Sequence, residues 1–155
     1  MAAFEYRQAE ALRDAFHRWN VRYLFLGKSG AILLGFPDTT QDVDLFPEKS
    51  LENGASLVAA LRELGFTLSD DQVNEVERGK DFVQLKNGPF DVDLIFAPDG
   101  IETFDEAWSR RVTVEGFPVC HPDDIIASKV AANRQKDHES LGRLRAFRDY
   151  WLRTR

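Results

Sequence analysis

The sequence is poor in the side chains that build disulfides and zinc sites. Cys120 is the one cysteine among 155 residues, which excludes an internal disulfide partner and a cysteine-based zinc site. His17, His121 and His138 are too far apart for metal-ligand spacing. No apolar run approaches the ~20 residues of a membrane-spanning helix, so no membrane partner is expected. The N-terminal residues carry acids and lack an apolar core, which predicts no signal peptide and favours a cytoplasmic protein.

Positive charge is scarce over most of the chain. Residues 1–128 hold 12 basic and 23 acidic side chains, whereas residues 129–155 hold 8 basic and 3 acidic ones. The net charge of −6 argues against broad, non-specific binding of nucleic acids. The basic C-terminal segment has two interpretations. It is either the solvated face of a helix or a phosphate-facing wall opposite an acidic site.

The hydrophobic pattern predicts one domain over residues 1–155, with a core at about 20–120 and C-terminal helices at about 122–153. Helices are expected at 4–19, 31–34, 51–64, 101–109 and 122–133, and a last helix is expected with Asp137 as its N-cap. Strands are expected at 21–26, 42–46, 81–86 and 90–96, followed by a small hairpin within 111–119. This mixed order predicts an α+β fold in which helices flank a β-sheet.

Two Asp-x-Asp pairs stand out within predicted strands. Asp42 and Asp44 form one pair, and Asp91 and Asp93 form the other. Residues two apart in a strand point to the same face, so each pair presents two carboxylates side by side. If the two strands lie together, three or four carboxylates surround one point. These negative charges repel one another unless a cation binds between them, and Mg²⁺ is a cation that prefers oxygen ligands. The alternative is that these acids are exposed charges on edge strands. Asp93 is the preferred third ligand and proton acceptor because it lies deeper in its apolar run, and Asp91 remains the alternative.

A glycine-serine turn precedes the first acidic pair. Gly27, Lys28 and Ser29 superficially resemble the end of a P-loop, but Arg22 stands where a P-loop requires glycine. A turn that enters a helix offers backbone N–H groups to phosphate, and Ser29 and Lys28 would add a hydroxyl and a charge. The alternative is an ordinary turn with Ser29 as N-cap. Thr40 is expected to steady the following loop or to contact a phosphate.

Four residues of the C-terminal segment are candidate accessory groups. Lys129 lies in an apolar helical stretch, where it either snorkels to solvent or reaches a triphosphate. Arg134, Lys136 and Asp137 follow it in an Arg-x-Lys-Asp sequence. The default role of Asp137 is the helix cap.

Together these motifs resemble the nucleotidyltransferase superfamily of the polymerase-beta type. The resemblance is strongest to small bacterial members, namely minimal nucleotidyltransferases and toxin-like proteins of abortive-infection and toxin–antitoxin systems. It spans about residues 20–145. The matching positions are Gly27, Gly35, Pro37, Thr40, Asp42, Val43, Asp44, Asp93, Ile125 to Lys129 and Arg134 to Asp137. The departures from the family pattern are Lys28 for a second glycine, Gly30 for a small alanine, Asp38 at a position often basic, and Ser140 for a second aspartate.

This resemblance implies the fold of that superfamily and transfer of a nucleoside monophosphate from an NTP to an acceptor hydroxyl, with release of pyrophosphate. It implies two Mg²⁺ ions on Asp42, Asp44 and Asp93. The turn backbone and Ser29 would hold the β- and γ-phosphates, with help from Lys129. The acceptor would be a protein, an RNA end or a small molecule, and a small partner protein is compatible with the family. The alternatives are a catalytically inactive binding module in a toxin–antitoxin pair and a metal-dependent nuclease.

Overall fold

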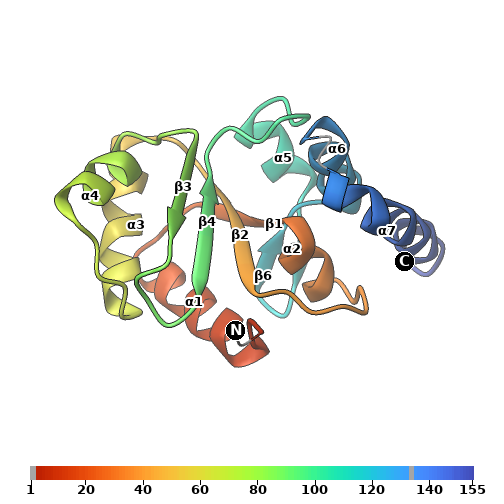
Figure 1. Ribbon diagram of the computed structural model, residues 1–155, viewed down its shortest axis with the longest axis horizontal. Coiled ribbons are helices and arrows are strands. Elements are labelled where there is room, and N and C mark those ends of the chain that lie inside the picture. The colour runs from red at the N-terminus through yellow and green to blue at the C-terminus, as the bar shows by residue number, and fades with distance from the viewer. Residues whose placement is uncertain (1–2, 133–134) are drawn as a thin grey trace.

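The computed structural model describes residues 3–132 and 135–155, apart from the side chains of residues 135–139. In this part of the chain the helices are α1 (Tyr6–Arg18), α2 (Gly27–Leu33), α3 (Leu51–Glu63), α4 (Asp70–Glu77), α5 (Phe104–Arg110), α6 (Pro122–Ala132) and α7 (Gln135–Arg153). The strands are β1 (Tyr23–Leu26), β2 (Asp42–Pro47), β3 (Phe82–Leu85), β4 (Asp91–Ile95), β5 (Val112–Val114) and β6 (Phe117–Val119). Helices flank the sheet, with α3 and α4 beside β3 and with α6 and α7 at the opposite end (Figure 1).

The strands form one mixed sheet in the order β3-β4-β2-β1-β6-β5. The pairs β2–β4 and β1–β6 are parallel, and the other neighbouring pairs are antiparallel. The predicted α+β class with a mixed sheet is therefore confirmed. The order also places the two strands that carry the acidic pairs next to each other, although 43 residues of chain lie between them.

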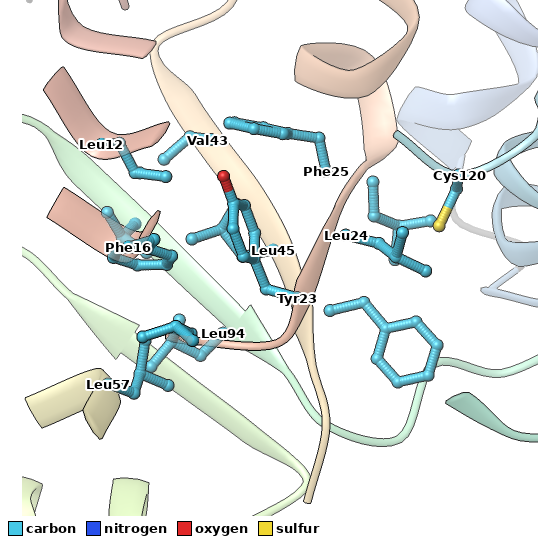
Figure 2. Close-up of a cluster of buried hydrophobic side chains, with 14 of the residues drawn as sticks. Leu12, Phe16, Tyr23, Leu24, Phe25, Val43, Leu45, Leu57, Leu94 and Cys120 are labelled. Carbon is cyan, nitrogen blue, oxygen red and sulfur yellow. The ribbon is translucent and has the colours of Figure 1, made fainter. Parts of the chain in front are cut away.

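One face of the sheet carries the hydrophobic core against α1 and α3. Val43 and Leu45 of β2 alternate with the aspartates and are fully buried, as are their neighbours on β4. Figure 2 shows Leu12 and Phe16 of α1 facing this face, close to Tyr23. The Phe16 and Tyr23 rings meet edge to face with centroids 4.7 Å apart. Period-2 alternation in the strands thus separates an apolar face from the face that carries the acids.

The other face is covered over only part of its width. Helix α2 packs on β1 and β2, and α6 packs on α2. On edge strand β3, however, Phe82 is 50% exposed and Gln84 is also exposed. The face that carries the acids is therefore covered by helix α2 on the β1 side and exposed to solvent on the β3 side.

The helices differ from the sequence-based expectations in four places. Helix α2 begins at Gly27 rather than Ala31, so the glycine-serine turn is its first turn. Helix α4 was not predicted. Helix α7 begins at Gln135, so Asp137 lies inside it and the prediction that it caps this helix is wrong. Trp19, the last residue of the helix expected at 4–19, follows α1 as its C-cap and is 44% exposed.

Two features bear on the expectations about cysteine and membranes. Cys120 is fully buried, and burial raises the pKa of its thiol well above the ordinary value. Figure 2 places it beside Leu24 in the core. Within the described residues, every helix is too short or too polar to cross a membrane.

Candidate active site

The two acidic pairs lie side by side in the sheet. In the parallel pairing of β2 and β4, Asp42 is level with Asp91, and Asp44 is level with Asp93. Adjacent strands are about 4.8 Å apart, and residues i and i+2 share a face, so the four residues form a compact two-by-two group on one face of the sheet. All four residues are half-buried. The structure therefore brings together the acids that the sequence analysis selected.

Gly27 makes room for one of these carboxylates. It follows Leu26, the last residue of β1, which is level with Asp44 in the antiparallel pairing with β2. A methyl group on residue 27 would overlap Oδ2 of Asp44 and lie 2.9 Å from its Cγ. Gly27 also has φ of +61°, in the left-handed region that favours glycine. The Asp44 carboxylate thus lies directly over the backbone at the start of α2.

The Ser29 hydroxyl joins this turn to β2. Its Oγ donates to the carbonyl of Leu26 at 2.9 Å and accepts from the backbone N–H of Asp44 at 3.0 Å. The residue is 3% exposed. A hydroxyl has a single proton to donate, so the Leu26 bond leaves none for a phosphate. The hydroxyl thus supports the backbone of Asp44, and the contact of Ser29 with a phosphate stays a prediction.

Thr40 organises the loop that enters β2. Its Oγ1 donates to the carbonyl of Asp42 at 3.0 Å, and the backbone N–H of Asp42 approaches the same Oγ1 at 3.4 Å. The carbonyl of Thr40 accepts from the N–H of Phe4 at 2.7 Å, which connects the N-terminal segment to the loop. Of the two predicted roles for Thr40, the contacts therefore match the steadying of the loop.

A charged cluster lies beside the turn. Lys28 Nζ is 3.4 Å from Oδ2 of Asp38, and Arg143 of α7 approaches the same oxygen at 3.2 Å. The backbone N–H of Thr39 donates to the Asp38 carboxylate and holds its pKa below the usual value, with a further contribution from Lys28. Arg143 also donates to the carbonyl of Pro37 at 3.0 Å. These contacts join α7 to the loop between α2 and β2.

The environment of Asp93 shifts the pKa of its carboxyl group. Burial raises its pKa above the ordinary value, and the nearby charge of Asp42 acts in the same direction. Hydrogen bonds from Gln84 and with Asp44 oppose the shift. The Gln84 bond runs from Nε2 to Oδ1 at 3.1 Å. Desolvation and like charge both disfavour the ionised form, and a bound cation would relieve both.

The overall arrangement matches solved structures. Lincosamide antibiotic adenylyltransferase LnuA, in its lincomycin-bound form, superposes with a TM-score of 0.67 over 94% of this chain and 99% of that chain, at 13% identity. A Thermotoga maritima protein, itself only provisionally assigned as a nucleotidyltransferase, superposes with a TM-score of 0.57 over 96% and 92%, at 16% identity. This chain has the nucleotidyltransferase fold. No protein-family model matches the sequence, and no curated protein matches it significantly.

Proteins of the nucleotidyltransferase fold commonly use a divalent metal, and the four acids have the chemistry to bind one. All four offer carboxylate oxygens, which are the donors that Mg²⁺ prefers. The side chain of Asp44 fills the space that Gly27 leaves open. Among the described residues, however, the side chains of Asp, Glu, His and Cys nowhere form a group of three or more that could hold a metal ion as they are placed. The donors thus fit a divalent cation in the chemistry of their oxygens and in the pairing of their strands.

The accessory candidates are less well placed by the structure. Lys129 is half-buried on α6, the helix that packs on α2. Arg134 lies outside the described residues, as do the side chains of Lys136 and Asp137. The suggested contact of Lys129 with a triphosphate and the accessory roles of Arg134, Lys136 and Asp137 stay predictions.

Two residues at the site, Gln84 and Arg143, were not predicted from the sequence. Gln84, which contacts Asp93, lies in a correctly predicted strand, and its alternation with buried Val83 already placed it on the acidic face. Arg143, which contacts Asp38, belongs to the basic C-terminal segment, but nothing in its local sequence distinguishes it from neighbouring arginines.

Proposed function

We propose that this protein transfers a nucleoside monophosphate from an NTP to an acceptor hydroxyl and releases pyrophosphate. The observation that carries the proposal is the register of β2 and β4, which sets Asp42 and Asp44 level with Asp91 and Asp93. The nucleotidyltransferase fold supports it independently. A row of carboxylates next to a glycine that admits close approach is suited to a metal-bound triphosphate.

Asp42, Asp44 and Asp93 are the residues that would hold Mg²⁺, with Asp91 as the alternative third ligand. Bound Mg²⁺ would neutralise charge on the phosphates and stabilise the attacking and leaving oxygens. Asp93 is preferred over Asp91 because it lies level with Asp44, whose carboxylate is over Gly27. Ser29 would act by fixing the backbone of Asp44 through its hydrogen bond.

The reaction needs one proton acceptor and one phosphate-binding surface. As the acceptor oxygen forms its bond to the α-phosphorus, its proton would pass to Asp93, whose pKa is raised in the direction that suits a general base. The bond from the α-phosphorus to the bridging oxygen breaks, and pyrophosphate leaves with that electron pair. The backbone of Gly27 and Lys28, with Lys129, would contact the β- and γ-phosphates.

The decisive experiment follows transfer of label from α-labelled NTPs. ATP, GTP, CTP and UTP are each incubated with Mg²⁺ and with one of three acceptor classes: total RNA, a cell protein extract, or small hydroxyl compounds including aminoglycosides and lincosamides. We expect one combination to become labelled by the wild-type protein. Label should fall by at least ~100-fold in Asp44→Asn. The matched control is Asp99→Asn, which removes one exposed carboxylate away from the sheet.

Transfer that persists in Asp44→Asn would contradict the assignment of the site. Nucleic-acid cleavage that needs Mg²⁺ but no NTP would instead favour a nuclease. The absence of any NTP-dependent product or binding would favour a binding module that acts with a partner protein.

A further inference from the structure

Gln84 occupies a distinctive position beside the acidic group. It lies on edge strand β3, level with Asp93 of the antiparallel neighbour β4. Its side chain is on the face opposite buried Val83 and Leu85, and its Nε2 donates to Oδ1 of Asp93 at 3.1 Å. Gln84 thus contacts one of the carboxylates from the accessible side of the sheet.

The chemistry of this contact suits a carboxylate that must bind a cation. A glutamine amide donates a hydrogen bond without carrying a charge. It therefore fixes the orientation of the carboxylate while leaving its full negative charge available. A lysine or arginine in the same place would form an ion pair and compete with the cation. With Oδ1 held, the orientation of the whole Asp93 carboxylate is fixed, and this carboxylate also interacts with Asp44.

We propose that Gln84 is a positioning residue that orients the Asp93 carboxylate for metal binding. This inference rests on the proposed function and extends it to a residue on a strand that carries no acid of the site. Hydrogen-bonded partners of ligating carboxylates commonly set metal affinity in this way. The competing explanation is an ordinary cross-strand pair that stabilises only the β3–β4 hairpin.

Two variants and one control separate these explanations. Gln84→Met keeps the length of the side chain and removes the donor. Gln84→Asn keeps the amide but shortens the side chain by one methylene, about 1.5 Å, which takes it beyond hydrogen-bond distance of Asp93. Phe82→Leu is the control because Phe82 is exposed on the same face of β3, two residues from Gln84.

The first readout is the dissociation constant for Mn²⁺ alone, measured by electron paramagnetic resonance without nucleotide. We expect both Gln84 variants to bind Mn²⁺ about 10- to 100-fold more weakly than the wild type, with Phe82→Leu unchanged. The second readout is steady-state kinetics at fixed Mg²⁺. We expect kcat to fall in both Gln84 variants while KM for the NTP stays within about twofold.

Each outcome decides the matter. Weakened Mn²⁺ binding in both Gln84 variants, with an unchanged urea midpoint of unfolding, supports the positioning role. Wild-type Mn²⁺ affinity in Gln84→Met overturns the positioning role. Wild-type Mn²⁺ affinity in Gln84→Asn overturns it as well, because an amide that does not reach Asp93 would then be sufficient. A wild-type protein that binds Mn²⁺ but transfers no nucleotide overturns the proposed function, and the metal readout still decides the role of Gln84.

Discussion

Replacing Gly27 with alanine tests the geometry of the site at a single methyl group. The new Cβ would overlap Oδ2 of Asp44, and residue 27 would keep a left-handed conformation with φ of +61°. An L-residue in that conformation costs roughly 1–2 kcal/mol. The overlap is relieved only if the Asp44 carboxylate or the turn moves by about 1 Å, and a displacement of that size at a reacting centre can cost ~100-fold in rate.

The expected result for Gly27→Ala is therefore twofold. The free energy of unfolding should fall by about 1–2 kcal/mol in urea denaturation, which leaves the protein folded. The kcat/KM for Mg²⁺-dependent nucleotidyl transfer should fall by about 100-fold, and Mn²⁺ affinity should fall with it. The loss of activity should exceed what the loss of stability explains.

Gly116→Ala is the matched control. Gly116 lies in the β5–β6 turn with φ of +76°, so alanine pays a similar backbone cost there. The nearest atom to its new methyl group would be Cδ of Arg13 at 3.3 Å, at the flexible part of a side chain. We expect a similar loss of stability with unchanged transfer. Equal activity in Gly27→Ala and Gly116→Ala would refute the claim that Gly27 makes room for Asp44.

Three further predictions concern buried polar groups and the buried thiol. Asn53→Ala removes two hydrogen bonds from the side-chain amide to the carbonyls of Arg22 and Glu48, and one hydrogen bond from the N–H of Arg22. We therefore expect the free energy of unfolding to fall by about 3 kcal/mol in urea denaturation. A loss below ~1 kcal/mol would show that water replaces these hydrogen bonds. Tyr23→Phe removes a buried hydroxyl for which the described residues provide no partner, so stability should stay equal or rise by about 1 kcal/mol; a clear loss would reveal a partner. Cys120 is buried and its thiol pKa is raised, so Ellman's reagent at pH 8 should react with it at least ~100-fold more slowly in native protein than in urea.

The sequence contained most of the information on which the candidate site depends. Alternation of aspartate with apolar residues predicted that Asp42 and Asp44 share one face, and likewise Asp91 and Asp93. The mixed sheet followed from the order of predicted elements. The adjacency of β2 and β4 could only be inferred from the need to gather carboxylates, because the pairing depends on how the whole sheet assembles.

The register of the β3–β4 hairpin was not accessible from local signals. The Asn87-Gly88 pair would usually indicate a turn of two residues between the strands. In the structure Leu85 pairs with Val92, so six residues lie between the paired positions and the connection is longer. Phe90 in this connection is buried and meets the rings of Phe66 and Phe4 edge to face. Aromatic packing thus anchors the connection between the two strands in which Gln84 and Asp93 pair.

Helix α4 escaped prediction for a different reason. Val76 is its one buried residue, so its apolar periodicity is weak. The signal that would have found it is the capping box at its start. The Ser69 hydroxyl accepts from the N–H of Gln72, and the Gln72 side chain accepts from the N–H of Ser69.

The central claim is that these carboxylates bind an NTP through Mg²⁺. The most direct test is a thermal-melt panel of ATP, GTP, CTP and UTP, each with and without Mg²⁺, on the wild type and on Asp42→Asn. A ligand at a hundredfold excess over its Kd stabilises the native state by ~2.7 kcal/mol, which a melt resolves easily. We predict a rise in Tm that requires both one NTP and Mg²⁺ and is lost in Asp42→Asn. A Tm that no nucleotide raises, or a rise that is the same in Asp42→Asn, would contradict the account.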